Sequence, residues 1–303
     1  MKIVIPGGSG HVGASLRRHF IRKGHEVLVI SRSGDDITWD GKTLGPWVDA
    51  LNGADVVINL AGRSVNCRYT ESNLKLMMDS RVASTRVVGQ ALASGKSPPK
   101  VWLQSSTATI YADRYDAPND EFTGIIGGNK PNVPALWGRS IQIALAWEAE
   151  LERAITPHTR KVAMRSAMTM SPDKGSIFDV LCGLSRRGLG GSIGGGRQYI
   201  SWIHEADFCN AVDTLIQDES LLGPINLCSP NPLPQWGFQK LLRKQLGQPI
   251  GLPAPKWMAT IGAMLMGTET ELIFKSRRVI PGILLTKGFK FNYPDWESPQ
   301  RTL

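Results

Sequence analysis

The sequence MKIVIPGGSGHVG, residues 1–13, decides the fold of this chain. A short apolar run at 2–5 leads directly into glycines that recur every three residues. The segment that follows places Val12 and Leu16 one helical turn apart, and Gly24 supplies the residue type that most often ends a helix. A strand, a glycine turn and a helix in this order predict the start of a βαβ unit.

The glycine turn has the features of a phosphate-binding loop. A tight strand-to-helix turn needs φ angles that glycine adopts at little cost, and a helix N-terminus favours an anion. The last of the three glycines lets the helix pack closely on the strand. A turn that binds nothing is the alternative, but the flanking elements favour dinucleotide binding. The residues expected to hold the pyrophosphate are Gly7, Gly8, Ser9, Gly10, His11, Val12 and Gly13.

The end of the second apolar run, 26–30, favours NADP over NAD. An NAD site usually has Asp or Glu at this point to hold the ribose hydroxyls, whereas this chain has Ser31 and Arg32. A hydroxyl and a planar guanidinium suit a 2′-phosphate. Asp35 and Asp36 follow closely and argue for NAD, and Arg32 could also be a solvated loop charge.

Short apolar runs alternate with helical patterns through the first two thirds of the chain. The runs are rich in Val, Ile and Leu, as buried parallel strands are. The alternation predicts an α/β fold with a Rossmann-type doubly wound parallel sheet. The expected strands are 2–5, 26–30, 55–60, 101–105 with its continuation 105–111, and 161–168, and the main helices are 73–93 and 141–154.

The pattern changes beyond about residue 175. We expect a small, mainly helical C-terminal cap over the carboxyl edge of the sheet. The predicted division is an NADP-binding Rossmann domain over 1–175, with its sheet completed by part of 176–231, and a substrate-side region over 176–303 that includes a helical cap over 232–303. The expected elements are a glycine-dense loop at 188–197, an apolar stretch at 199–203, a strand at 224–227, and helices around 208–215, 236–246, 255–266 and 269–278.

The composition is typical of an ordinary soluble enzyme. The 303 residues are 42% hydrophobic and 20% charged. No apolar run is long enough to span a membrane, and the first is too short for a signal peptide, so we expect a cytoplasmic protein with no membrane partner. The net charge of +9 is spread along the chain without a basic stripe, which argues against nucleic-acid binding. Binding of a phosphorylated cofactor accounts for part of this positive charge.

The four cysteines are far apart in sequence and form no CxxC pair. This spacing argues against both a disulfide framework and a zinc site, so no metal is expected and buried reduced thiols are the simpler interpretation. Cys67 differs from the others because it lies in a polar and basic cluster, Asn66-Cys67-Arg68-Tyr69. It is the cysteine worth testing for reactivity, with an inert thiol as the alternative.

Three motifs occur in order along the first part of the chain: the glycine turn, NLAG at 59–62, and SSTATIY at 105–111. Together they resemble the extended branch of the short-chain dehydrogenase/reductase superfamily, which includes nucleotide-sugar epimerases and dehydratases. Further matches resemble its atypical "epimerase family protein" group, with a small C-terminal domain of unknown function. These are a helix with Arg81, GLGG at 188–191, GRQY at 196–199, WIH at 202–204 and NLCSP at 226–230.

The resemblance implies roles for residues outside the glycine turn. Leu60 and Ala61 would line the adenosine side of the cofactor, where the small residues at 61 and 62 also permit close passage; a plain turn is the alternative. Thr107 would hydrogen-bond a substrate hydroxyl or carbonyl. With Ser31 and Arg32 on the 2′-phosphate, the implied cofactor residues are completed by Leu60, Ala61, Gly62, Arg81, Ser105, Met168 and Thr169.

One motif of the family is missing. Active members carry YxxxK on the helix after the fifth strand, where Tyr is the acid/base and Lys lowers its pKa. The corresponding segment here, RSIQIALAWE at 139–148, contains neither residue and has Ser140 and Ala144 in about their places. An unassisted tyrosine, with a pKa of about 10, is a poor base at neutral pH. The usual mechanism is therefore not available as it stands.

Other polar residues could supply the missing chemistry. Tyr111 could face the site, although an aromatic covering the sheet edge is the favoured interpretation. His204 ionises near neutral pH and could donate a proton, or it could cap the helix that begins there. Arg165 and Arg197 could bind an anionic substrate, with a structural ion pair preferred for Arg165, and Trp202 could wall the pocket. The candidate catalytic residues are Thr107, His204 and Tyr111.

These features predict an NADP(H)-binding protein of the epimerase or oxidoreductase kind that acts on a small polar substrate. The complete cofactor half, Thr107 and a glycine-rich lid at 188–197 support this hypothesis. The missing dyad supports the alternative, a non-catalytic NADP(H)-binding sensor or partner-docking protein.

Overall fold

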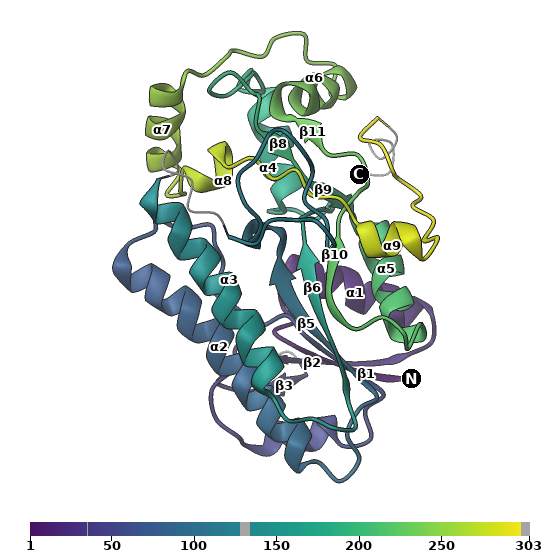
Figure 1. Ribbon diagram of the computed structural model, residues 1–303. Helices are drawn as coiled ribbons and strands as arrows, with labels where there is room; N and C mark the ends of the chain where they lie inside the picture. The colour runs from purple at the N-terminus through teal and green to yellow at the C-terminus, as the bar shows by residue number, and fades with distance from the viewer. Residues whose placement is uncertain (35, 128–133, 298–303) are drawn as a thin grey trace.

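The computed structural model describes residues 1–34, 36–127 and 134–297. Within these ranges, seven parallel strands form the main sheet, with helices on both sides (Figure 1). This is a Rossmann-type doubly wound architecture, so the predicted fold class is confirmed. The order across the sheet is β10 (Gly223–Leu227), β6 (Arg160–Ser166), β5 (Val101–Thr107), β4 (Val56–Asn59), β1 (Lys2–Pro6), β2 (Glu26–Ser31) and β3 (Ile37–Thr38).

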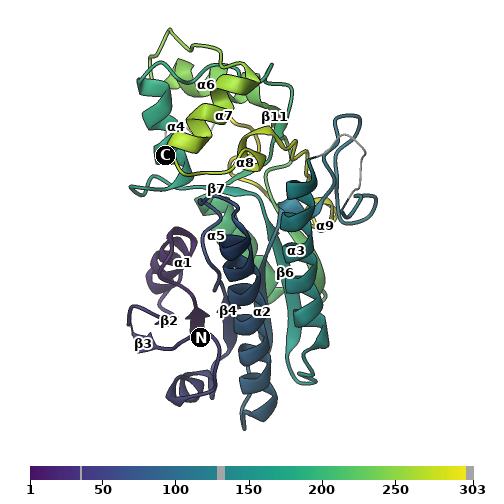
Figure 2. The ribbon, with the colours of Figure 1, turned by 90° about the vertical axis from the view of Figure 1, so that its left-hand side faces the viewer.

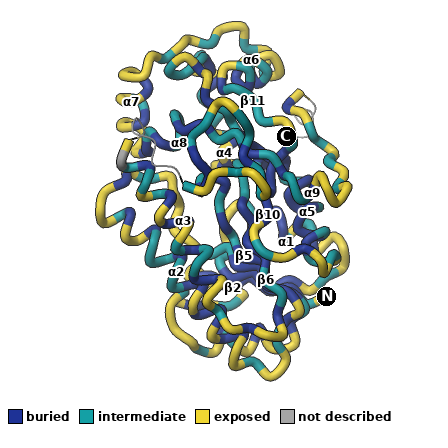
Figure 3. Tube along the Cα trace, in the orientation of Figure 1, coloured by how far each residue is buried: buried dark blue, intermediate teal, exposed yellow. Residues whose placement is uncertain are grey.

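Helices cover both faces because successive residues of each strand point to opposite sides of the sheet. Ile3 and Ile5 pack with Leu16 and Phe208 on one face, whereas Val4 packs with Val87 on the other. Figure 2 shows α2 and α3 lying side by side, and Figure 3 shows that the buried residues follow the sheet. The helices around the sheet are α1 (His11–Arg22), η1 (Pro46–Leu51), α2 (Glu71–Ser94), α3 (Ala135–Arg153), α5 (Glu205–Gln217) and α9 (Gly282–Thr286).

A second, smaller body lies above the carboxyl ends of the strands (Figure 1). Its core is aromatic: Trp296 stacks on Phe238 at 4.0 Å between ring centroids and meets Trp202 edge-on at 4.8 Å. Trp202 is fully buried in this core, so the expectation that it walls a substrate pocket is wrong. The elements here are β7 (Met168–Met170), α4 (Ile177–Arg186), β8 (Tyr199–Ile200), β9 (Trp202–His204), β11 (Leu233–Pro234), α6 (Gln235–Gln245), α7 (Lys256–Leu265) and α8 (Glu271–Phe274).

Two predicted strands are shorter than expected. The segment 161–168 divides after Ala167. The Ala167 amide still donates to the Leu227 carbonyl at 3.0 Å and continues the pairing of β6 with β10, whereas Met168 pairs with β9 in another sheet. The segment 105–111 is a strand only as far as Thr107. One turn of 3₁₀ helix, η2 (Ala108–Ile110), follows, and the Thr107 hydroxyl caps it by accepting from the Thr109 amide at 3.1 Å.

The predicted helix at 269–278 is also mostly wrong, because only α8 is helical there. After α8 the chain extends, and the Arg277 amide donates to the Tyr199 carbonyl at 2.9 Å. The buried side chain of Lys275 donates to the Thr109 carbonyl at 2.7 Å. Tertiary hydrogen bonds thus replace the helical ones that the local sequence would allow. The sequence did not predict β3, η1, α4 or α9.

The glycine-dense loop at 188–197 is a packed connection and does not form the lid that the sequence suggested. A Cβ at Gly191 would lie 2.1 Å from the Leu252 carbonyl oxygen, and the Gly194 amide donates to the Ala254 carbonyl at 2.8 Å. The glycines therefore allow two backbone segments to touch.

Candidate functional site

The glycine turn is held by close backbone contacts that exclude any side chain. Gly7 has φ +76°, and a Cβ there would lie 2.4 Å from both N and Cα of Ala61. A Cβ at Gly13 would lie 2.1 Å from the Gly8 carbonyl oxygen. These two glycines serve the packing of β1, α1 and the loop after β4, as the sequence predicted for Gly13.

Gly10 is different because it borders open space. It is the N-cap of α1, no side chain caps the helix there, and no heavy atom lies within 4 Å of a Cβ built on it. The first turn of α1 carries no acidic residue. Backbone amides at this helix end are therefore available to an anion, and the residues present fit the pyrophosphate of a dinucleotide.

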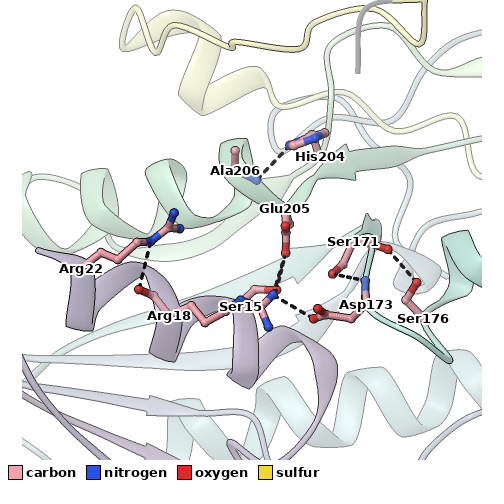
Figure 4. Close-up of polar contacts among 9 residues, drawn as sticks. All are labelled: Ser15, Arg18, Arg22, Ser171, Asp173, Ser176, His204, Glu205 and Ala206. Carbon is pink, nitrogen blue, oxygen red and sulfur yellow. Dashed lines mark hydrogen bonds and ion pairs between the residues drawn. The ribbon is translucent and has the colours of Figure 1, made fainter. Parts of the chain in front are cut away.

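Polar contacts tie α1 to α5 and to the loop after β7 (Figure 4). Ser15 donates to Glu205 at 2.6 Å, and Arg18 pairs with both Asp173 at 2.8 Å and Glu205 at 3.2 Å. The loop that carries Asp173 also approaches the start of α1, where a Cβ at Gly175 would lie 3.8 Å from the His11 ring. The glycine turn thus has a defined position relative to the carboxyl edge of the sheet.

The end of β2 presents Ser31 and Arg32 as the sequence predicted. Ser31 is buried and accepts from the Gly34 amide at 3.1 Å, while Arg32 is exposed. Asp36, one of the two carboxylates that argued for NAD, accepts from the Val29 amide at 2.8 Å and pairs with Arg17 at 2.9 Å. Through these two contacts the Asp36 carboxylate links α1 to β2. The other carboxylate, Asp35, lies outside the described residues.

The loop after β4 lies directly beside the glycine turn. The Leu60 amide donates to the Pro6 carbonyl at 2.8 Å, and the Ala61 amide donates to the Asn59 side chain at 3.1 Å. A Cβ at Gly62 would lie 3.3 Å from Cγ of Arg81. The structure therefore brings the glycine turn, residues 60–62 and Arg81 together, as the resemblance implied.

A pocket of about 230 Å³ opens at the carboxyl end of β5. Its wall combines the strand end, α2, α3, the loop after β4 and α8. Predicted residues Arg81, Ser105 and Thr107 line it, whereas Met168 and Thr169 lie in β7, paired with β9. The other lining residues are Val65, Tyr69, Met77, Ser106, Thr109, Ser140, Ile143, Ala144, Trp147 and Leu272.

Arg81 is a buried cation in this wall. Only 9% of its surface is exposed, and its guanidinium donates to the Met77 carbonyl at 3.0 Å and lies 4.9 Å from the centroid of the Trp147 ring. Burial lowers its pKa to about 10. Among the described residues no carboxylate pairs with it. A buried guanidinium that lacks a carboxylate partner favours a negatively charged group in the pocket.

Two of the predicted catalytic residues have structural partners instead. Tyr111 is 2% exposed, donates to Asn226 at 3.0 Å and accepts from Arg165 at 2.9 Å. His204 is 3% exposed, and its Nδ1 accepts from the Ala206 amide at 3.0 Å as the N-cap of α5 (Figure 4). Burial lowers the pKa of His204 to about 4, so it is neutral at pH 7 and has no extra proton to donate.

The remaining candidates fall outside the pocket wall. Arg165 pairs with Glu148 at 2.8 Å, the structural alternative that the sequence favoured. Arg197 is exposed. Cys67 is half-buried in the loop after β4, and the other three cysteines are buried. In the described part of the chain, no group of three His, Cys, Asp or Glu side chains is arranged to hold a metal.

Sequence reasoning missed a polar cluster at the base of the pocket. Tyr69 and Ser140 both line the pocket, and Ser140 donates to Glu271 of α8. The sequence placed Tyr69 only in a polar cluster and Ser140 only in the place of the absent tyrosine. Glu271 follows Tyr69 by about two hundred residues in the chain, so no local pattern could have joined them.

Comparisons with known proteins agree with this geometry. The model of the NAD dependent epimerase/dehydratase family matches residues 3–134, which span the glycine turn and the loops after β4 and β5. This part of the chain is similar to members of that family. A second model, a domain of unknown function (DUF1731), matches residues 254–299, which include α7, α8 and α9. The predicted resemblance is confirmed by both matches.

Relatives of similar length carry the same general name. The chain is 29% identical over 305 residues to an epimerase family protein of Bacillus subtilis, YfhF, covering 98% of this chain and 96% of that protein. It is 27% identical to the human epimerase family protein SDR39U1, covering 97% of each chain. The shared name gives no substrate.

Solved structures show the same fold. The human SDR39U1 structure, described as containing NADPH, superposes with a TM-score of 0.86 at 24% identity and covers 100% of this chain and 98% of that one. A dTDP-4-dehydrorhamnose reductase from Clostridium acetobutylicum superposes with a TM-score of 0.73 at 16% identity, covering 100% and 98%. No helix in the described ranges is long and apolar enough to cross a membrane.

Proposed function

We propose that this protein is an NADP(H)-dependent oxidoreductase or epimerase that acts on a small polar carbonyl or hydroxyl compound. The observation that carries the proposal is the juxtaposition of an uncapped helix N-terminus at Gly10 with a pocket at the carboxyl end of β5. In doubly wound sheets, ligands bind at this edge. The human relative crystallised with NADPH supports the choice of cofactor.

The cofactor residues of this proposal come from three strand ends. The turn from Gly7 to Gly13 would hold the pyrophosphate through backbone amides. Ser31 and Arg32 would hold the 2′-phosphate, because Asp36 is already engaged with Arg17 and the β2 backbone. The adenosine side would be lined by Leu60, Ala61 and Gly62, with Ser105, Met168 and Thr169 toward the nicotinamide. When bound, the cofactor supplies hydride transfer.

The substrate would occupy the pocket beside Arg81 and Thr107. The buried guanidinium of Arg81 has no carboxylate partner within the described part of the chain, and such a cation favours a ligand region that carries negative charge. Thr107 lies at the end of β5 and lines the pocket. We propose that this hydroxyl binds the substrate oxygen. Tyr111 and His204 have no part in the proposed reaction, since both are buried in other contacts.

A cofactor titration tests the first half of the proposal. Enhancement of NADPH fluorescence on mixing with the protein should give saturable binding, with NADH binding more weakly. Preferential binding of NADH would contradict the assignment of Ser31 and Arg32. NADPH binding without turnover of any carbonyl compound would favour the alternative function, a redox sensor or partner-docking protein, for which the absent YxxxK dyad is the supporting observation.

The proposed division of labour follows the chain. Residues 1–175 would bind the cofactor, with part of 176–231 completing the sheet, and residues 232–303 would close the substrate side. The position of α8 against the pocket supports this division, since Leu272 lines the same wall as Ser105 and Thr107.

A further inference from the structure

Arg81 lines the pocket with a guanidinium that uses only part of its hydrogen-bonding capacity. Its Nη1 donates to the Met77 carbonyl at 3.0 Å. Within the described residues, Nε and Nη2 have no hydrogen-bond partner, and neither atom is completely enclosed. The absence of a side chain at Gly62 helps to keep this edge open, since a Cβ there would lie 3.6 Å from Nε. Nε and Nη2 can therefore donate to a ligand.

The same edge of two other arginines in this protein holds a carboxylate. Nε and Nη2 of Arg165 donate to the two oxygens of Glu148 at 2.9 and 2.8 Å. The corresponding atoms of Arg86 donate to Glu150 at 2.8 and 3.2 Å. This two-point geometry suits a planar carboxylate. Arg81 has the same pair of donors, so the carboxylate of a ligand fits its open edge.

Burial makes the missing anion important. Arg81 is buried, and its guanidinium lies 4.9 Å from the centroid of the Trp147 ring. Tyr69, on the same wall, supplies no negative charge, because burial raises its pKa to about 12. The carboxyl group of Glu271 lies behind Ser140 and accepts a hydrogen bond from it. An anion bound in the pocket would compensate the buried charge of Arg81.

The rest of the pocket limits the molecule that carries this carboxylate. Its volume of about 230 Å³ equals that of about eight molecules of liquid water, which suits a compact ligand. The Thr107 hydroxyl accepts from the Thr109 amide at 3.1 Å, and its own hydrogen has no acceptor within the described residues, so it can donate to a carbonyl oxygen. The apolar part of the wall suits a short alkyl chain and consists of Val65, Met77, Ile143, Ala144, Trp147 and Leu272.

We propose, on the basis of the function proposed above, that the substrate is a small 2-oxo acid whose carboxylate binds Nε and Nη2 of Arg81. Its carbonyl oxygen accepts from Thr107, and its alkyl chain contacts the apolar wall. A 2-oxo acid carries the carboxylate and the carbonyl on adjacent carbons, which suits two recognition groups in one small pocket. Arg81 is then a substrate-binding residue, in place of the role beside the cofactor that the resemblance implied.

The reaction converts the 2-oxo acid into a 2-hydroxy acid. The carbonyl carbon gains a hydride as the C=O π bond breaks, and NADPH is thereby oxidised to NADP+. The carbonyl oxygen gains a proton from water. The carboxylate keeps its charge throughout, so Arg81 binds the substrate and the product through the same contact. Loss of this contact should therefore raise KM and leave kcat nearly unchanged.

Calorimetric titration of the NADP+-loaded protein tests the carboxylate contact without turnover, because NADP+ has no hydride to transfer. We expect 2-oxobutanoate to bind, and its methyl ester, which is neutral and has nearly the same shape, to bind at least about tenfold more weakly. Inorganic phosphate is the competing anion and should not displace 2-oxobutanoate at equal concentration. Tighter binding of phosphate than of 2-oxobutanoate would contradict the assignment of a carboxylate.

Three arginine variants locate the effect. Arg81→Met keeps the length of the side chain without the charge and should weaken 2-oxobutanoate binding about 100-fold. Arg81→Lys keeps the charge without the two-point edge and should weaken it about tenfold. Arg153→Met, which removes an exposed arginine at the end of α3, is the control and should change nothing. Absorbance of NADPH gives KM and kcat for each variant, and circular dichroism checks folding.

The outcomes separate the substrate from the proposed function. Equal binding of acid and ester by the wild type would overturn the carboxylate contact, and this comparison requires no variant to fold. Unchanged 2-oxobutanoate binding in Arg81→Met, or loss of NADPH binding in that variant, would overturn the role of Arg81. A wild type that reduces the ester but not the acid would refute the 2-oxo acid and leave the proposed function intact. Failure of the wild type to bind NADPH would overturn the proposed function itself.

Discussion

The glycine turn and the pocket at the end of β5 are built in opposite ways. The turn comes from one run of seven residues, and its contacts are mainly between backbone atoms. The pocket collects side chains from residues as distant as Tyr69 and Leu272. Anion binding by a helix end needs only local geometry, whereas substrate recognition needs side chains that come from many elements. The first kind of site can be found in a sequence, and the second kind needs the fold.

The strongest test of this contrast is the comparison of two glycines in the turn. Gly13→Val should lower the free energy of unfolding by about 3 kcal/mol or more, because a Cβ there meets the Gly8 backbone, which cannot move away easily. Gly10→Ala should cost less than about 1 kcal/mol, since nothing lies near its Cβ and its φ of −83° suits alanine. Chemical denaturation measures both.

NADPH binding should be affected by Gly10→Ala, the variant that changes stability least. Gly10→Ala should stay folded and still weaken NADPH binding, because its methyl group occupies the space that a phosphate would approach. Unchanged NADPH affinity in a folded Gly10→Ala protein would contradict the placement of the pyrophosphate at this helix end.

A second prediction concerns the pH dependence of stability at His204. Its folded pKa of about 4 lies below the unfolded value, so the unfolded state binds more protons between these two pH values. Stability should therefore fall as pH drops from about 6.5 to about 4. His204→Asn keeps a side-chain cap without the ionisation and should remove up to about 3 kcal/mol of that fall. Thermal melts across this pH range decide the point, and identical pH profiles would refute it.

The third prediction separates the buried network of Tyr111 from the pocket. Tyr111→Phe leaves Asn226 and Arg165 without the hydroxyl that joins them, which should lower the free energy of unfolding by about 1–3 kcal/mol. NADPH affinity and 2-oxobutanoate reduction should stay unchanged in the folded protein. A selective loss of reduction with normal stability would return Tyr111 to the list of catalytic residues.

The smallest effect is expected at the edge of the cofactor site. Arg32→Ala removes an exposed charge and should leave stability unchanged while weakening NADPH binding about tenfold, or ~1.4 kcal/mol. NADH binding should not change, because NADH has no 2′-phosphate. Arg22→Ala, another exposed arginine at the end of α1, serves as the control for a general loss of positive charge. If both variants weakened NADPH binding equally, Arg32 would be only a solvated loop charge with no contact to the 2′-phosphate.

The local sequence predicted the strands well where no tertiary hydrogen bond opposes the local preference. The boundaries of β1 and β2 differ from the prediction by one residue each, because a buried parallel strand needs only a short apolar run. The errors came where tertiary hydrogen bonds compete with local preference. Met168 pairs with β9 in another sheet and divides one predicted strand, and Lys275 donates to the Thr109 carbonyl where the prediction continued the helix at 269–278.

The sequence by itself determined the βαβ start, the glycine turn and the absence of Tyr and Lys from residues 139–148. Each of these depends on residues that are neighbours in the chain, so spacing and residue type were sufficient. The tertiary structure alone decided that His204 caps a helix, that Tyr111 joins a buried network, and that Glu271 lies behind Ser140. Burial and the identity of distant partners set the protonation of such groups, and neither is encoded in any local stretch of the chain.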